Sequence, residues 1–181
     1  ENERPIVAQI FGSNPENILK AAKLAKKMGF DGVDINMGCP DRNVEKQGGG
    51  AALIKNPKIA ALVIKAAKKV GLPVSVKTRL GYSKPEVKEW LGFLLKQDLA
   101  ALTIHLRTRK EMSDVPSNWE MMDEIVKLRN KLSPKTLILG NGDIKDLADA
   151  KEKIIRYKID GVMIGRGVFG NPWFFSDQSK D

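Results

Sequence analysis

The chain has 181 residues, 42% of them hydrophobic and 29% charged, which is typical of one soluble globular domain and excludes a disordered chain. No apolar run approaches the roughly 20 residues that a membrane-spanning helix needs, so we expect no membrane span. The 31 lysines and arginines outnumber the 22 aspartates and glutamates, and the net charge of +9 favours polyanionic partners such as nucleic acids or phosphates.

Six short apolar runs recur along the chain and are predicted to be β-strands. They are Ile6–Ile10, Gly32–Ile35, Val74–Val76, Ala101–Ile104, Leu137–Leu139 and Gly161–Ile164. Each run is almost continuously hydrophobic rather than alternating between apolar and polar residues. This pattern predicts strands that are buried on both faces.

Amphipathic helical patterns separate these runs. The first helix is predicted to begin at Pro15 after the N-cap Asn14, and Asn56-Pro57 repeats this signal for the second. Further helices are predicted near Pro85–Lys96, Trp119–Lys131 and Asp146–Tyr157. A regular alternation of strands and helices implies right-handed crossovers and a parallel sheet.

Polar residues follow every predicted strand, and their positions distinguish two parallel folds. They are Gln9 and Gly12, Asn36 to Cys39, Lys77 and Arg79, His105 and Arg107, Asn141 to Asp143, and Gly165 to Gly167. A barrel gathers all strand ends around one mouth, whereas a doubly wound sheet uses one switch point. We therefore predict a (β/α)8 TIM-type barrel, incomplete at about six βα units because eight need about 250 residues.

Two glycine-rich loops, Gly140–Asp143 and Gly165–Gly167, end the last two predicted strands. Their backbone N–H groups can approach a phosphate closely, and Arg166 adds a charged fork of donors. Tight turns without a ligand are the alternative interpretation. Barrels often hold phosphate after strands seven and eight, so the missing units are predicted to be the first two.

Lys77 directly follows Val74–Val76 and is expected to enter the mouth of the barrel, whereas Thr78 would point the other way. A cation there could hold an anion, form a Schiff base or stabilise negative charge on a cofactor ring. Arg79 repeats the charge two residues later. A structural salt bridge with a neighbouring carboxylate is the alternative.

His105 is the only histidine, and the segment that it begins also contains Arg107 and Arg109. This group of cations suits an anionic surface such as a ribose-phosphate backbone. There are two alternatives: a histidine that only satisfies a hydrogen bond, and a charge run that lies in solvent.

Cys39 is the only cysteine, which excludes an intramolecular disulfide and favours a reducing, cytoplasmic compartment. It lies between Gly38 and Pro40 on a tight turn at the predicted mouth, where Asn36 could fix a polar ligand. An unperturbed thiol is mostly protonated at neutral pH and can donate a proton. A buried, inert cysteine is the alternative. One cysteine and one histidine are too few for a typical zinc site, so no metal is expected.

Five motifs in this order resemble the tRNA dihydrouridine synthase family. They are Asn36–Pro40, Val76–Gly81, His105–Arg109, Gly140–Ile144 and Met163–Gly167, the last continuing through Asn171-Pro172-Trp173. Gln9–Gly12 and Gly48–Leu53 match as well. The resemblance therefore covers nearly the whole chain.

This resemblance implies an FMN-binding barrel that reduces the C5=C6 bond of a uridine in tRNA, with NADPH as the usual reductant of the flavin. It implies that Cys39 is the general acid. The substrate would be contacted by Asn36, Arg79 and Arg107. The flavin would be held by Gln9, Lys77, His105, Asn141, Gly142, Asp143, Gly165 and Arg166.

Two parts of typical family members have no counterpart in the sequence: the opening segment with the first strand, and the C-terminal helical domain that grips tRNA. We therefore expect residues 1–181 to form a partial catalytic barrel whose open strand edges could pair with another copy. A catalytically inactive RNA- or phosphate-binding barrel is the alternative function. A third is a lyase with a Schiff base at Lys77.

Overall fold

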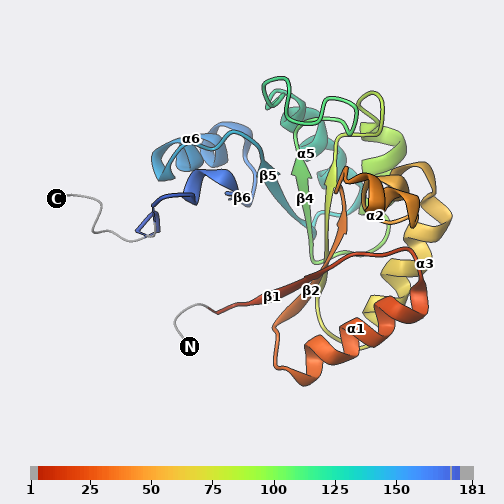
Figure 1. The fold of residues 1–181 in the computed structure, drawn as a ribbon. Helices are drawn as coiled ribbons and strands as arrows, with labels where there is room; N and C mark the ends of the chain where they lie inside the picture. The colour runs from red at the N-terminus through yellow and green to blue at the C-terminus, as the bar shows by residue number, and fades with distance from the viewer. Residues whose placement is uncertain (1–3, 172, 176–181) are drawn as a thin grey trace.

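The structure, a computed structural model, describes residues 4–171 and 173–175; Pro172, part of the last motif, lies outside them. Within this part of the chain, six parallel strands pair in chain order in one curved sheet (Figure 1). They are β1 (Val7–Ile10), β2 (Gly32–Met37), β3 (Val74–Arg79), β4 (Ala101–His105), β5 (Leu137–Asn141) and β6 (Gly161–Met163). A doubly wound sheet reverses its strand order, so the sequential order identifies a partial TIM-type barrel and confirms the predicted fold class.

Helices separate the strands, and most of them cover the outer face of the sheet (Figure 1). They are α1 (Pro15–Lys27), α2 (Arg42–Lys46), α3 (Pro57–Lys68), α4 (Gly92–Leu95), α5 (Met121–Leu132) and α6 (Leu147–Tyr157), with 3₁₀ turns at Gly50–Lys55 and Arg166–Val168. The Asn14 side chain accepts hydrogen bonds from backbone N–H groups at the start of α1, and Asn56 does the same for α3. Both predicted N-caps are therefore confirmed.

The segment predicted as one helix at Pro85–Lys96 is divided in two. One turn of π-helix spans Val87–Leu91, and the short α4 follows it directly. The indole N–H of the buried Trp90 donates a hydrogen bond of 2.9 Å to the Thr78 hydroxyl on β3. This contact also shows that Thr78 points toward the helices, as predicted, because Trp90 lies on the helical side of the sheet.

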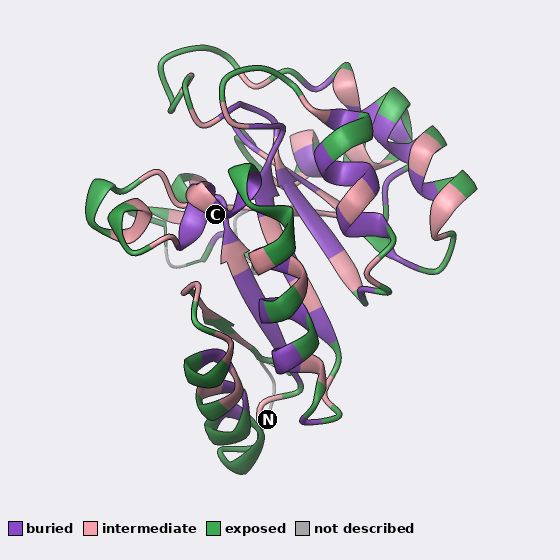
Figure 2. Ribbon diagram, turned by 90° about the vertical axis from the view of Figure 1, so that its right-hand side faces the viewer, coloured by how far each residue is buried: buried purple, intermediate pink, exposed green. Residues whose placement is uncertain are grey.

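The prediction that the strands are buried on both faces holds for β2, where five of the six residues are buried, but not for β1 or β5, where more and less exposed residues alternate. In β5, Leu137 is 50% exposed whereas its neighbour Ile138 is fully buried. The same alternation runs through most of the sheet: the residues that face the helices form the core, and those that face the concave side are mostly half-buried (Figure 2). The two faces differ because helices pack on only one of them in the described chain. The strands also end later than predicted, by two residues in β2 and by three in β3. Polar side chains such as Lys77 and His105 therefore lie within the strands and not after them.

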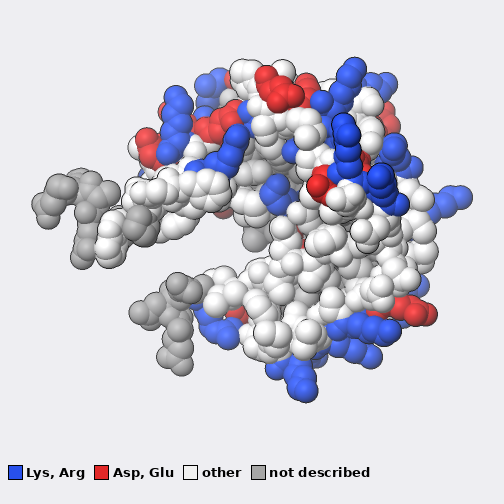
Figure 3. Space-filling view, viewed as in Figure 1, with Lys and Arg blue, Asp and Glu red and all other residues white. Residues whose placement is uncertain are grey.

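The concave face opens into a deep hollow. Figure 3 shows it between the part of the molecule that contains β1 and α1 and the part that contains β6 and α6, with basic side chains on its upper edge and inside it. No helix among the described residues is both long enough and apolar enough to cross a membrane. The hollow lies between the two edge strands of the sheet, β1 and β6, which do not pair with each other in the described chain.

Gly140 provides a test of how closely the helices pack on β5. A Cβ atom at this position would lie 2.5 Å from the Trp119 ring and 3.2 Å from the Met122 methyl group. We expect Gly140→Ala to lower the free energy of unfolding by about 1–3 kcal/mol, because overpacking forces the core apart. Urea denaturation measures this change. Gly165→Ala is the matched control, since no heavy atom lies within 4 Å of its Cβ position, and equal losses in both variants would contradict the packing argument.

Candidate functional site

A cavity of about 580 Å³ opens at the carboxyl ends of β3 to β6. This volume is within the usual range of small-molecule sites. Eight of the predicted site residues line it: Lys77, His105, Arg107, Asn141, Gly142, Asp143, Gly165 and Arg166. Sequentially distant motifs therefore converge on one cavity, as the barrel interpretation requires.

Lys77 brings a positive charge into this cavity without a direct hydrogen bond or ion pair to it. Its ammonium group makes no hydrogen bond or ion pair with any residue that the structure describes. Burial, and then the charge of Arg79, lower the pKa of Lys77. The nearby charge of Asp34 offsets these effects only in part, and an anionic ligand in the cavity would offset them further.

Arg107 lines the cavity, although only 3% of its side chain is exposed. Its guanidinium donates two hydrogen bonds to the Asp143 carboxylate, at 2.8 and 2.6 Å, and one to the Val115 carbonyl. Asp143 also accepts a hydrogen bond from the Ser117 backbone N–H. Burial would raise the pKa of Asp143, but these bonds from Arg107 and Ser117 outweigh it and hold the pKa at about 2. Most Arg107 donors are therefore committed to the protein itself.

His105 is a neutral imidazole in this environment. Burial, followed by the charges of Arg79, Lys77 and Arg107, lowers the pKa of His105 to about 3. One Arg107 nitrogen lies 3.0 Å from His105 Nε2. A guanidinium can only donate, so Nε2 must accept, and the single ring proton is on Nδ1.

The two glycine-rich loops lie next to each other at the cavity. The Asn141 amide donates a hydrogen bond of 2.8 Å to the Met163 carbonyl, which joins the end of β5 to the end of β6. Arg166 extends from the second loop with 69% of its side chain exposed, and its guanidinium is 3.9 Å from Asp143. An exposed guanidinium beside glycine backbone is well suited to bind a phosphate.

Four predicted residues do not line this cavity, and three of them, Gln9, Asn36 and Arg79, lie on β1, β2 and β3. Gln9 donates a hydrogen bond to the buried carboxylate of Asp34 and accepts one from the Asn36 amide. Ser75 donates a further bond of 2.6 Å to Asp34. Asn36 pairs in register with Lys77, so this polar chain continues along the concave face to the cavity.

Cys39 is half-buried on the loop between β2 and α2. The Asn36 side-chain oxygen accepts hydrogen bonds from the Gly38 and Cys39 backbone N–H groups, at 3.0 and 2.9 Å. Cys39 lies close enough to Lys77 and Arg79 to interact electrostatically with both. The thiol is therefore beside the cationic part of the cavity.

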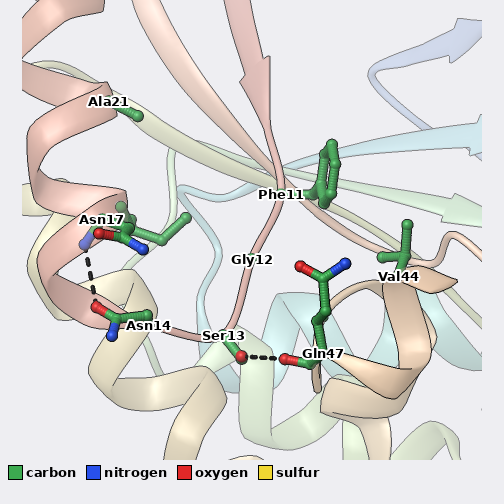
Figure 4. A pocket seen from close by; sticks show the side chains of 10 residues that line it. Phe11, Gly12, Ser13, Asn14, Asn17, Ala21, Val44 and Gln47 are labelled. Atoms are coloured by element: carbon green, nitrogen blue, oxygen red, sulfur yellow. Dashed lines mark hydrogen bonds between the residues drawn. The ribbon is translucent and has the colours of Figure 1, made fainter.

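A second cavity, of about 380 Å³, lies between the end of β1, the start of α1 and the loop after α2 (Figure 4). The Ser13 hydroxyl donates a hydrogen bond to the Gln47 carbonyl at its edge. None of the ten residues that line this cavity is ionisable. It therefore lacks the acid, base and cationic groups that the first cavity brings together.

Two residues of the site, Ser113 and Lys145, belong to no motif that the sequence analysis named. Ile144, Met163 and Gly167, which lie in the named motifs, complete the lining of the larger cavity with them. Asp34 had a signal that could have identified it, since a carboxylate within a buried apolar run needs partners. Ser113 lies in a loop and had no such signal. Among the described residues, no group of three or more histidine, cysteine, aspartate or glutamate side chains could hold a metal ion.

Sequence comparisons link this chain to known proteins. The model of the dihydrouridine synthase (Dus) family matches residues 1–181. A probable tRNA-dihydrouridine synthase 2 of Bacillus subtilis (strain 168) is 52% identical over 182 residues, covering 100% of this chain and 56% of the relative. A probable tRNA-dihydrouridine synthase of Staphylococcus aureus (strain COL) is 50% identical with the same coverage. The chain thus spans little more than half the length of these curated relatives.

Solved structures resemble the fold. A mandelate racemase/muconate lactonizing enzyme from Roseiflexus sp. matches with a TM-score of 0.59 at 14% identity, over 90% of this chain and 40% of that one. Ruminococcus gnavus sialic acid aldolase matches with a TM-score of 0.57 at 14% identity, over 87% of this chain and 53% of that one. At such low identity, these similarities support the partial barrel alone.

The neutral state of His105 predicts how stability depends on pH. The folded chain keeps His105 unprotonated down to about pH 3, whereas an unfolded histidine binds a proton near pH 6.5. Stability should therefore fall as the pH drops through this window, with a contribution from His105 on the order of 1 kcal/mol per pH unit. Urea denaturation between about pH 7 and pH 5 measures the slope. His105→Gln keeps an acceptor for Arg107 but cannot titrate, so an equally steep slope in this variant would contradict the assignment.

Proposed function

Because the chain belongs to the dihydrouridine synthase family, we propose that it forms the core of the FMN-binding catalytic barrel of an enzyme that reduces the C5=C6 bond of a uridine in tRNA. The observation that carries the proposal is the cavity at the ends of β3 to β6, where Lys77 makes no hydrogen bond or ion pair with any described residue. The thiol of Cys39 lies beside it. An anionic cofactor and a proton donor are what a flavin-dependent reduction needs.

The lining of the cavity fits FMN at both ends of that molecule. Exposed Arg166 and the two glycine-rich loops supply donors for a phosphate. Lys77 would hold negative charge on the reduced ring, and His105 has an Nδ1 proton available to donate. Gln9 would contact the ring from β1. We assign Arg107 to holding Asp143 and His105 in place, since its donors are used within the protein.

The reaction adds one hydride and one proton across the uracil double bond. When bound, FMN supplies the hydride for C6, and NADPH is the proposed reductant that restores it. Cys39 donates its thiol proton to C5 from the opposite side of the base. Lys77 and Arg79 stabilise the negative charge that builds up on the uracil before that proton arrives. Asn36 holds the Cys39 loop in place through two backbone hydrogen bonds.

The proposed substrate is a tRNA strand whose target base leaves its stack. A uridine inside a stacked helix cannot place C5 and C6 between a thiol and a flavin, so the base must be extruded. The net charge of +9 favours binding of the phosphate backbone around the hollow. We therefore propose that basic side chains on the rim hold the strand while the base enters.

Arg166→Ala tests the phosphate end of the cavity. We expect the affinity for FMN to fall roughly tenfold, because a charge-assisted contact is lost. Fluorescence titration of the flavin measures this loss. Riboflavin is the matched control ligand, since it has the same ring without the phosphate, and its affinity should not change. Equal losses for both ligands would show that Arg166 does not contact the phosphate.

Cys39→Ala tests the proton donor. Reduction of the bound flavin by NADPH should continue at the wild-type rate, because that step needs no proton from Cys39. Reduction of uridine in tRNA should fall by about 10²- to 10⁴-fold, the usual contribution of a general acid. Stopped-flow absorbance near 450 nm follows both steps. Unchanged uridine reduction would refute the acid role, and purified protein that binds no flavin would instead favour the inactive RNA-binding barrel.

A further inference from the structure

The backbone on either side of Cys39 is held by two arginines from other parts of the chain. Arg79 Nε on β3 donates a hydrogen bond of 2.8 Å to the Gly38 carbonyl, directly before the cysteine. Arg109 Nη2 donates one of 3.2 Å to the Pro40 carbonyl, directly after it. The position of the thiol therefore depends on one side chain at the end of β3 and one in the segment after β4.

Arg109 also binds the helix that follows the cysteine. Its Nε and Nη2 atoms donate to one oxygen of Glu45 on α2, at 2.8 and 2.5 Å. The ion pair is largely shielded from water, with 22% of the Arg109 side chain and 12% of the Glu45 side chain exposed. It joins positions 64 residues apart in the sequence. The pair thus ties both Pro40 and α2 to the segment after β4.

Arg79 connects the same two segments through a second set of hydrogen bonds. Besides the Gly38 carbonyl, its guanidinium donates to the carbonyls of Thr108 and Met112, at 3.0 and 2.8 Å. Arg109 lies between these two residues in the sequence. Arg79 and Arg109 therefore hold the loop before α2 against the loop after β4. Their hydrogen bonds reach the residues directly before and directly after the cysteine.

The remaining contacts reach the backbone carbonyl of the cysteine from Gly50 and Ala51. The Ala51 N–H donates 2.9 Å to the Cys39 carbonyl, and a Cβ at Gly50 would lie 2.5 Å from that same oxygen. These contacts fix the carbonyl side of the residue. The ion pair between Arg109 and Glu45 joins α2 to the segment after β4.

We propose that Arg109 and Glu45 are positioning residues, which hold the Cys39 loop so that the thiol reaches the uracil. The proposal rests on the proposed function, in which Cys39 donates the proton. Neither residue lines the larger cavity, so neither is placed to bind the flavin. Loss of the pair should therefore slow proton delivery while it leaves cofactor binding intact, since small displacements of a reacting group cost much of its rate.

Two conservative variants test this idea in the chain as it stands. Glu45→Gln keeps the shape of the side chain but removes its charge, and Arg109→Lys keeps the charge but loses the fork that reaches Glu45 and Pro40 together. Asp98→Asn is the matched control, since it weakens the exposed ion pair between Lys68 and Asp98 on another part of the surface. All three variants are compared with wild type by FMN titration, which reports whether the cavity remains intact.

The first readout is the alkylation rate of Cys39 by iodoacetamide, which is specific because this chain has one cysteine. Both variants should react severalfold faster than wild type, because the loop is released. The second readout is single-turnover reduction of uridine in tRNA, which should slow by about tenfold or more with unchanged FMN affinity. Asp98→Asn should behave as wild type in both assays.

Wild-type alkylation and wild-type reduction rates in both variants would overturn the proposal. Loss of FMN binding in both would also overturn it, since the pair would then support the fold in general. The charge-swapped double variant Glu45→Arg with Arg109→Glu should recover part of the reduction rate, and no recovery would argue against the pair. If Cys39→Ala itself reduces uridine normally, the acid role fails, whereas alkylation still reports whether the pair holds the loop.

Discussion

The alternation of side chains along the central strands is the constraint on which the rest of the structure depends. In β3, Val76 and Thr78 point toward the helices and join the core, so Lys77 and Arg79 must point to the concave face. The same alternation places Asn36, His105 and Asn141 on that face, in register with residues of the neighbouring strands. Packing of the helices therefore decides which residues the cavity receives.

A second consequence is electrostatic. The alternation of side chains gathers several cations in a small space. The protein provides some of these cations with hydrogen-bond acceptors and others with none. Arg107 receives a carboxylate partner in Asp143, and Arg79 receives backbone carbonyls. Lys77 receives neither from the described residues, and its charge helps to keep His105 neutral. The site thus combines a cation that no side chain or carbonyl binds directly with an uncharged donor, an arrangement suited to an anionic ring that also needs hydrogen bonds.

The cysteine loop shows how the barrel uses long-range contacts to arrange a short segment. Cys39 lies in a turn with little regular structure, and two arginines from neighbouring strand ends hold the carbonyls on either side of it. Strand ends of a parallel barrel meet at one mouth, so a residue after β4 can reach a loop after β2. A loop can hold a reactive side chain such as the Cys39 thiol in a defined position because the strands that carry the loop are rigid.

The sequence by itself determined the strand and helix alternation, the helix N-caps at Asn14 and Asn56, and most of the residues that line the cavity. These features depend on local patterns, since caps and apolar runs act within a few residues. The tertiary structure alone decided that the strands have one open face, and that Arg107 is occupied while Lys77 is not. The reason is that hydrogen-bond partners such as Asp143 for Arg107 or Glu45 for Arg109 lie 36 and 64 residues away, and no local pattern reveals which donors they will take.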